Sequence, residues 1–341
     1  MPSDPDSPQH LLWLRLYSKI VSYSTLFLIF LGGLVKSAES GLSVPDWPTT
    51  YGYFMFSFPL DQMVGGIRYE HTHRLVASII GLMTLFLAVW LSRSKVDAWL
   101  KKLGALAFVL VVAQGVLGGM TVKFHLPVWT SSMHGVLAQT FFLVTILIAY
   151  GLSNERTVRK SEDLKGIDGK YIRMAIIFLG MVFIQLIIGN LLRHTESGLA
   201  VPDFPTMGGT MIPTFDQAML NRINAWNFEH DHELVTMGQV HIHILHRFWA
   251  LLILLKLIYL NMLAYKNCLQ RPFVLKTLFL LNAAILTQIG LGIATVMSMK
   301  EIYTTTFHVA AGAVVLALSF LLVLRSAPVS WQAYRQKVSQ R

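Results

Sequence analysis

Residues 39–48 read Glu-Ser-Gly-Leu-Ser-Val-Pro-Asp-Trp-Pro, and residues 196–205 repeat this stretch as Glu-Ser-Gly-Leu-Ala-Val-Pro-Asp-Phe-Pro. Eight of the ten positions are identical, at an offset of 157 residues. Further matches follow at an offset of 174, where Gln114 and Gly118 correspond to Gln288 and Gly292. Self-similarity at a long period indicates a duplicated architecture. The chain is therefore expected to consist of two related halves.

The composition indicates a membrane protein. Hydrophobic residues make up 54% of the 341 residues, charged residues make up 13%, and the mean hydropathy is +0.54, whereas soluble domains carry about 25% charged residues. Eight apolar stretches are long enough to span roughly 30 Å of hydrocarbon at about 1.5 Å per residue. They predict an all-α integral membrane protein with transmembrane helices near residues 19–38, 67–92, 102–122, 131–152, 171–193, 237–263, 273–297 and 304–325.

The basic residues predict how the chain is oriented in the membrane. One side of the predicted membrane holds 19 of the 28 Lys and Arg residues, whereas the opposite loops, 39–66 and 194–236, contain only Arg222. Loops rich in Lys and Arg are cytoplasmic, so both termini are expected in the cytoplasm. This distribution also explains the formal net charge of +10. Because the basic residues form no continuous stripe, we expect membrane lipid around the chain and no nucleic-acid partner.

Each half contains four predicted helices, so both halves enter the membrane from the same side. They are expected to form two pseudo-symmetric four-helix bundles related as parallel repeats. The N-terminus lacks the arginine-rich, acid-poor composition of a transit peptide, which favours a bacterial plasma membrane. The predicted organisation is a cytoplasmic segment at 1–18, a first bundle at 19–152, a linker at 153–170, a second bundle at 171–325 and a cytoplasmic tail at 326–341.

Four of the twelve histidines occupy matched positions. His73 and His134 lie at the outer starts of the second and fourth predicted helices, 61 residues apart, and His246 and His308 lie at the corresponding places, 62 residues apart. Two imidazoles that face each other across a bundle can ligate a haem iron. A single membrane histidine is more often a hydrogen-bonded packing residue, but two equivalent pairs favour two haem sites toward the outer face. Zinc and copper are disfavoured because the single cysteine, Cys268, lies on the cytoplasmic side.

The two predicted sites differ at one position. Glu70 lies three residues before His73 and hence on the same helix face, whereas His243 lies three residues before His246. Ionisable groups at membrane depth are costly and usually functional, so Glu70 is the candidate catalytic residue, as a proton-transferring carboxylate beside an iron site. An ion pair with a neighbouring arginine, or a favourable charge near the helix N-terminus, explains Glu70 equally well.

An arginine follows the first histidine of each pair, giving His73-Arg74 and His246-Arg247. These arginines can pair with haem propionates or stabilise carbonyl groups of the outer loops. The duplicated Gly-Leu-x-Val-Pro-Asp loop is rich in turn-forming residues. We interpret this loop as a structural element that can also cover the edge of a porphyrin.

With these residues assembled, the chain closely resembles the haem A synthase family. The resemblance covers roughly residues 19–325, and its motifs are Glu70-x-x-His73-Arg74, His134 in Met-His-Gly, His246-Arg247, His308 in Phe-His-Val and the duplicated loop. Together these motifs are specific, whereas any one of them alone is weak. Many members of the family carry a cysteine pair in the outer loops, and residues 39–66 and 194–236 of this chain contain no cysteine. Redox roles assigned to such cysteines therefore cannot operate here.

The resemblance implies a haem-modifying oxidoreductase that converts the C8 methyl group of haem O into a formyl group through a hydroxymethyl intermediate. It also implies that His246 and His308 bind a b-type haem as electron carrier, that His73 and His134 receive the substrate haem O, and that Glu70 is the essential glutamate. The expected partners are haem O synthase, assembly factors of cytochrome oxidase, and a quinone or another electron acceptor. The histidines themselves also fit a diheme cytochrome b-type electron-transfer protein, and parallel repeats are compatible with a transporter.

Overall fold

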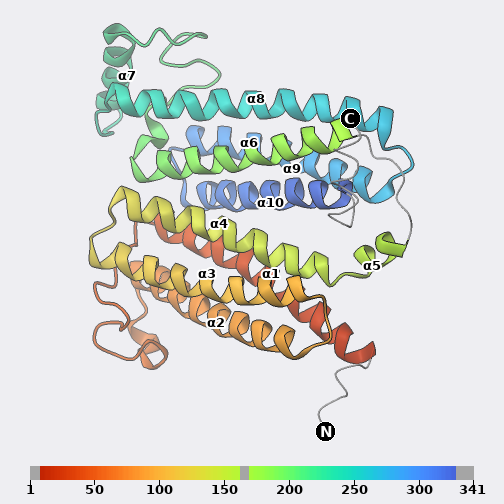
Figure 1. The fold of residues 1–341 in the computed structure, drawn as a ribbon. Coiled ribbons are helices and arrows are strands. Elements are labelled where there is room, and N and C mark those ends of the chain that lie inside the picture. The colour runs from red at the N-terminus through yellow and green to blue at the C-terminus, as the bar shows by residue number, and fades with distance from the viewer. Residues whose placement is uncertain (1–7, 162–168, 328–341) are drawn as a thin grey trace. The chain divides into compact units, whose positions relative to one another are not determined.

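The computed structural model describes residues 8–161 and 169–327, and these residues form ten α-helices. Eight of the helices are long and apolar enough to cross a membrane, which confirms the prediction of eight spans (Figure 1). The spanning helices are α1 (Pro8–Ser37), α2 (Gly65–Arg93), α3 (Ala98–Lys123), α4 (Val128–Gly151), α6 (Gly169–His194), α8 (Met237–Asn267), α9 (Pro272–Met297) and α10 (Ile302–Ser326).

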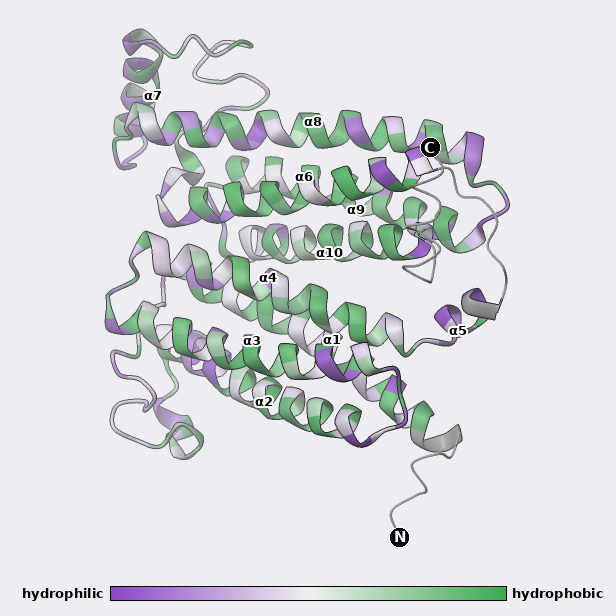
Figure 2. Ribbon diagram, viewed as in Figure 1, coloured by the Kyte–Doolittle hydropathy of each residue, from purple (hydrophilic) through white to green (hydrophobic). Residues whose placement is uncertain are grey.

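The outward faces of these helices are apolar, as expected of surfaces that contact lipid. Leu82 on α2 is 62% exposed and Phe279 on α9 is 72% exposed. Figure 2 shows hydrophobic residues along the length of the helices and hydrophilic residues mostly at their ends and in the loops. Hydrocarbon offers no hydrogen bonds to a polypeptide backbone, so a helix that bonds its own backbone is a stable way to span it.

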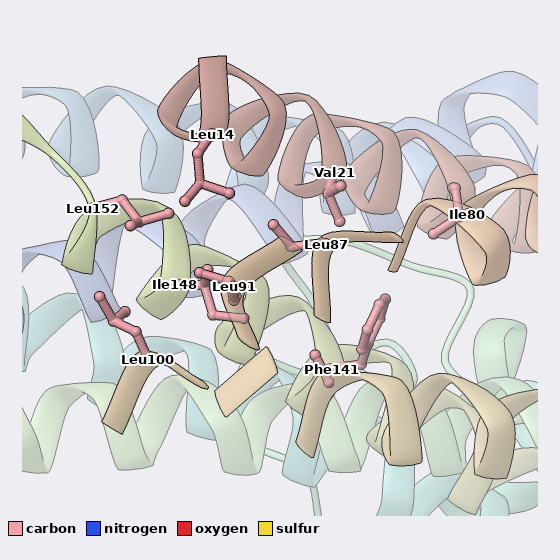
Figure 3. Packing of buried hydrophobic residues seen from close by; sticks show 10 residues of the cluster. Leu14, Val21, Ile80, Leu87, Leu91, Leu100, Phe141, Ile148 and Leu152 are labelled. Atoms are coloured by element: carbon pink, nitrogen blue, oxygen red, sulfur yellow. The ribbon is translucent and has the colours of Figure 1, made fainter. Parts of the chain in front are cut away.

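The chain divides into two compact units. The first unit contains α1 to α4 and the short helix α5 (Asn154–Ser161), and the second unit contains α6 to α10. In the first unit α1 packs against α2 and α4, α2 packs against α3, and α3 packs against α4, so the four helices form a closed bundle. Its core includes Leu14 from α1, Leu87 and Leu91 from α2, and Phe141 and Ile148 from α4 (Figure 3). In the second unit α9 packs against both α8 and α10.

Three helical segments extend beyond the predicted spans. Helix α1 already begins at Pro8, inside the predicted N-terminal segment, because apolar side chains such as the fully buried Leu14 pack into the core of the first unit. Helix α5 lies in the predicted linker. Helix α7 (Gln217–Glu229) lies in the second outer loop and begins at Asp216, whose side chain accepts a hydrogen bond from the Met219 amide at 2.8 Å. Three single-turn 3-10 helices cover Met55–Ser57, Leu60–Gln62 and Ser197–Leu199.

Helix α7 is held against the outer start of α8. Its buried residues Met219 and Ile223 pack in one cluster with Val201 of the duplicated loop and with Val240 of α8. Thr236 caps α8 in a capping box with Gln239, and this arrangement fixes where the helix begins. The second outer loop is thus folded onto the helix that carries His246.

The two copies of the duplicated loop have the same backbone design. The carboxylate of Asp46 accepts a hydrogen bond from the Gly52 amide at 2.9 Å, and that of Asp203 accepts one from the Gly209 amide at 2.9 Å. Gly52 has a φ of +79° and Gly209 a φ of +83°, values at which a side chain is strained. Burial raises the pKa of each Asp, but the hydrogen bonds outweigh this effect and lower the pKa below its usual value. The loops also share a cis peptide bond, at Trp47–Pro48 and Phe204–Pro205.

Candidate functional site

The two predicted ligand histidines of the first unit each lie against a glycine of the neighbouring helix. A methyl group added at Gly32 of α1 would lie 3.1 Å from Cε1 of His73 on α2, and one added at Gly118 of α3 would lie 3.2 Å from Cε1 of His134 on α4. These distances are shorter than ordinary van der Waals contacts, so a methyl group at either glycine would require the imidazole to shift by a few tenths of an ångström. The two rings are close enough to interact electrostatically.

The second unit repeats this arrangement. A methyl group at Gly189 of α6 would lie 3.2 Å from Cε1 of His246, and one at Gly292 of α9 would lie 3.0 Å from Cε1 of His308. The ring centroids of His246 and His308 are 6.5 Å apart, with their planes at 70°. The structure therefore brings this predicted pair together in the interior of the second unit.

This spacing fits two axial ligands of one metal ion. Two metal–imidazole bonds of about 2 Å each, together with the distances of about 1 Å from each nitrogen to its ring centre, place the centroids roughly 6 Å apart. Among the described residues, Nδ1 of His73, His134 and His308 is buried without a hydrogen-bond partner. Buried polar atoms in native proteins nearly always have a partner, so each exception calls for an explanation, and a role in binding a ligand is one.

Two neighbouring histidines show what a packing histidine looks like in this fold. Nδ1 of the buried His71 lies 3.0 Å from the hydroxyl of Thr50, and Nδ1 of the buried His243 lies 3.0 Å from the carbonyl oxygen of Ser197. Both rings thus have hydrogen-bond partners in the outer loops. This contrast separates His71 and His243 from His73, His134 and His308, whereas Nδ1 of His246 lies 3.2 Å from Nε2 of Gln185.

Glu70 connects the first site to the outer loop. Its Oε1 lies 2.5 Å from Nη2 of Arg74, and its Oε2 accepts a hydrogen bond from the Val44 amide at 2.9 Å. Glu70 is only 4% exposed and Arg74 9%. The ion pair is the one foreseen as an alternative explanation of Glu70. It holds a buried carboxylate one helical turn, or about 5 Å along the axis, before His73.

The two arginines donate to matched carbonyl groups of the duplicated loops. Arg74 donates to Val44 at 2.9 Å and to Asp46 at 2.7 Å. Arg247 donates to the equivalent Val201 at 2.7 Å and to Asp203 at 2.8 Å. Each arginine also donates to one further loop carbonyl, that of Thr49 or Thr206. The structure thus gives both arginines the role of stabilising loop carbonyls.

Some residues around the sites were not predicted to belong to them. Gly32 and Gly118 are recognisable in the sequence only as close-packing residues, and Gly189 corresponds to Gly32 at an offset of 157 residues. Arg193, near the end of α6, acts electrostatically on His308, and Lys36 occupies the matched position at the end of α1. Their signal in the sequence is the offset of 157 shared with the duplicated loop.

Sequence comparison identifies the family. The family model described as "Cytochrome oxidase assembly protein" matches residues 15–320. The chain belongs to this family. The match covers all eight spanning helices except the ends of α1 and α10, and it includes both histidine pairs and both copies of the loop.

Members of the family from several bacteria are similar over nearly their whole length. The haem A synthase of Halalkalibacterium halodurans is 25% identical over 302 residues, which cover 86% of this chain and 91% of the relative. The haem A synthase of Erythrobacter litoralis is 26% identical over 346 residues, covering 92% and 94%. That of Pelagibacter ubique is 24% identical over 360 residues, covering 94% and 98%.

Proposed function

We propose that this chain is a haem A synthase, a membrane oxidoreductase that converts the C8 methyl group of haem O into a formyl group through a hydroxymethyl intermediate. Its family membership and its similarity to haem A synthases support this proposal. The observation that carries it is the difference between two otherwise matched sites. In the first unit the buried Glu70 precedes His73 by three residues on α2, whereas in the second unit His243 precedes His246 by three residues on α8.

The two histidine pairs take different roles. His73 and His134 hold the substrate haem O in the first unit. His246 and His308 would hold a b-type haem in the second unit, which would supply electron transfer. The unpartnered imidazole nitrogens and the glycines beside the rings support both assignments.

Glu70 serves as the proton acceptor near the reacting methyl group. With water as the oxygen source, oxidation of the methyl group to hydroxymethyl and of hydroxymethyl to formyl each releases two protons and two electrons. The electrons pass to the quinone or other electron acceptor, and the protons need an acceptor at the site. Oε1 of Glu70 stays paired with Arg74, while Oε2 has one backbone partner, the Val44 amide. A carboxylate oxygen has two lone pairs, so Oε2 can take up a proton and still accept from Val44.

The chain resides in a bacterial plasma membrane with both termini in the cytoplasm and both sites toward the outer face. The distribution of Lys and Arg supports this orientation. Arg74 and Arg247 fix the loops over the sites, and a contact with haem propionates is a second role for their guanidinium groups. The partners in this proposal are haem O synthase, assembly factors of cytochrome oxidase, and a quinone or another electron acceptor.

Replacement of Glu70 tests the proposal. The wild type, Glu70→Ala, Glu70→Gln and the exposed control Asp61→Asn should each be expressed in cells that make haem O, and the extracted haems separated by chromatography. We expect formyl product from the wild type and the control, and bound but unoxidised haem from both Glu70 variants. If Glu70→Gln forms as much formyl product as the wild type, Glu70 has only a structural role. If the folded wild type yields only unmodified haems, the chain is not a haem A synthase.

The second candidate is a diheme cytochrome b-type electron-transfer protein. The repetition of the same histidine–glycine arrangement in both units favours it, since two equivalent haems suit electron transfer. This function gives no reason for a carboxylate in one unit alone. The same experiment separates the two candidates, because an electron carrier would leave both haems unaltered.

A further inference from the structure

Two glutamines hold the backbone of ligand histidines on the neighbouring helix. In the first unit, Nε2 of Gln114 on α3 donates to the backbone carbonyl of His134 at 2.8 Å. In the second unit, Nε2 of Gln185 on α6 donates to the backbone carbonyl of His246 at 3.0 Å and also lies 3.2 Å from Nδ1 of the same imidazole. One amide of α6 thus contacts both the ring and the backbone of His246.

A third glutamine occupies the same position on α9. Nε2 of Gln288 lies 3.3 Å from where a methyl group would sit on Gly312, one turn beyond His308. Each of the three glutamines precedes the glycine under its imidazole by four residues, in the pairs Gln114–Gly118, Gln185–Gly189 and Gln288–Gly292.

The fourth position breaks the pattern. The glycine under His73 is Gly32, and the residue four positions before it is Leu28. The ring of His73 lies as close to its glycine as the other three rings do, at 3.1 Å. His73 and Gly32 are therefore equivalent to the histidine and glycine at the other three positions. Only the side-chain amide of a glutamine is missing here.

The local sequence explains how a glutamine reaches a helical carbonyl. The carbonyl of a helical residue accepts from the amide four residues later and keeps a second lone pair. Small residues four positions after the histidines leave that lone pair accessible, namely Ala138, Ala250 and Gly312. Hydrogen bonds between membrane helices fix the separation and register of the helices. The glutamine thereby fixes the depth at which the imidazole enters the site.

The same amides offer an unused acceptor. Oε1 of Gln114, Gln185 and Gln288 is buried without a hydrogen-bond partner. An imidazole that ligates a metal carries its proton on the other nitrogen and donates it to a nearby acceptor, which fixes the ring orientation. At His246, Nε2 of Gln185 lies 3.2 Å from Nδ1 and 3.4 Å from Nε2 of the ring, so this amide stands beside both ring nitrogens.

We propose that Gln114, Gln185 and Gln288 are positioning residues for the iron ligands, and that Leu28 makes His73 the exchangeable ligand of the chain. This inference rests on the proposed function, because it requires haem between the paired histidines. In the second unit a glutamine stands at both positions: Gln185 donates to the backbone of His246, and the amide of Gln288 lies beside Gly312, one turn from His308. This arrangement suits a haem that stays bound. In the first unit only His134 is held, so the substrate haem is taken up and released on the side of His73.

The purified holoprotein allows a direct test with Gln185→Met, which keeps the side-chain length and removes the amide. Loss of haem to excess apomyoglobin should be roughly tenfold faster than in the wild type, since removal of a partner of a metal ligand typically weakens metal affinity at least tenfold. The low-spin EPR g values of the haem should also shift, which a purely structural defect would not produce. Gly180→Ala on the same helix is the matched control, because a methyl group there has no neighbour within 4 Å.

The reverse variant, Leu28→Gln, tests the first unit independently of how Gln185→Met folds. We expect it to slow the release of haem O from the first unit roughly tenfold. The inference would be overturned if Leu28→Gln released haem O as fast as the wild type, or if Gln185→Met showed unchanged haem loss and unchanged g values. Bound haem and formyl product in the same preparations would still support the proposed function. A wild type that binds no haem would refute the proposed function, and the inference would fall with it.

Discussion

Arg74 and Arg247 make matched bonds to matched loops, and only Arg74 also pairs with a carboxylate. Replacing each arginine by alanine removes three donated hydrogen bonds to carbonyl groups. Arg74→Ala in addition leaves the charge of Glu70, which is 4% exposed, without its cation. The difference between the two variants therefore measures the free energy of that buried ion pair.

The structure sets the size of each effect. Loss of the carbonyl bonds should cost about 3 kcal/mol of local stability in either loop, because bonds to charged groups contribute about 1.5–3 kcal/mol each and do not add fully. An unpaired buried charge should cost about 3 kcal/mol more. Arg74→Ala should thus destabilise its loop by about 3 kcal/mol more than Arg247→Ala does. The double variant Glu70→Gln with Arg74→Ala should return to the level of Arg247→Ala.

Hydrogen exchange of the loop amides measures these local stabilities. The amides of Gly52 and Gly209 donate to Asp46 and Asp203, so they report on the first and second loop respectively. A difference of about 3 kcal/mol corresponds to a roughly hundredfold faster exchange of Gly52 in Arg74→Ala than of Gly209 in Arg247→Ala. Equal acceleration in the two loops, or a double variant no more stable than Arg74→Ala, would refute the reasoning.

Two further predictions concern the glycine under a ligand and the buried loop carboxylate. Gly189→Ala places a methyl group 3.2 Å from Cε1 of His246, so the absorbance spectrum of the bound haem should shift, whereas Gly180→Ala should leave it unchanged; identical spectra would show that the ring moves freely. The pKa of Asp203 is lowered in the folded loop because hydrogen bonds outweigh its burial, so its contribution is complete above the unfolded pKa of about 4 and is lost as the pH falls through the folded value. Exchange of loop amides, corrected for the intrinsic rate, should accelerate below about pH 4 in the wild type and lack this acceleration in Asp203→Asn.

The spanning helices are predictable because an apolar run of the right length has few other stable conformations in a bilayer. Their ends are less predictable. Arg15 and Lys19 lower the hydropathy of the first turns of α1, yet Leu14, directly before Arg15, is fully buried. Helix α7 has no such run, and its position depends on Met219 and Ile223 meeting a surface of α8 that is distant in sequence.

The candidate ligands are predictable from the repeat, but their surroundings are only partly so. The offset of 174 already pairs Gly118 with Gly292. It does not reveal that Gly32 and Gly189 face His73 and His246, because that requires knowing which helices are neighbours and how they are rotated. The partners of Glu70 were foreseen only as one of two explanations, since an arginine four residues away on a helix is available to a carboxylate whether or not it is used.

The matched arginines have a consequence for how a duplicated protein can diverge. Each loop is fastened by an arginine that needs only backbone carbonyls as partners, and backbone carbonyls survive any substitution of side chains. The residue three positions before the first histidine of each pair can therefore differ while the arginine keeps the loop in place: Glu70 accepts from the Val44 amide in one copy, and Nδ1 of His243 lies 3.0 Å from the Ser197 carbonyl in the other. A scaffold built in this way lets two copies keep one shape while their interiors acquire different chemistry.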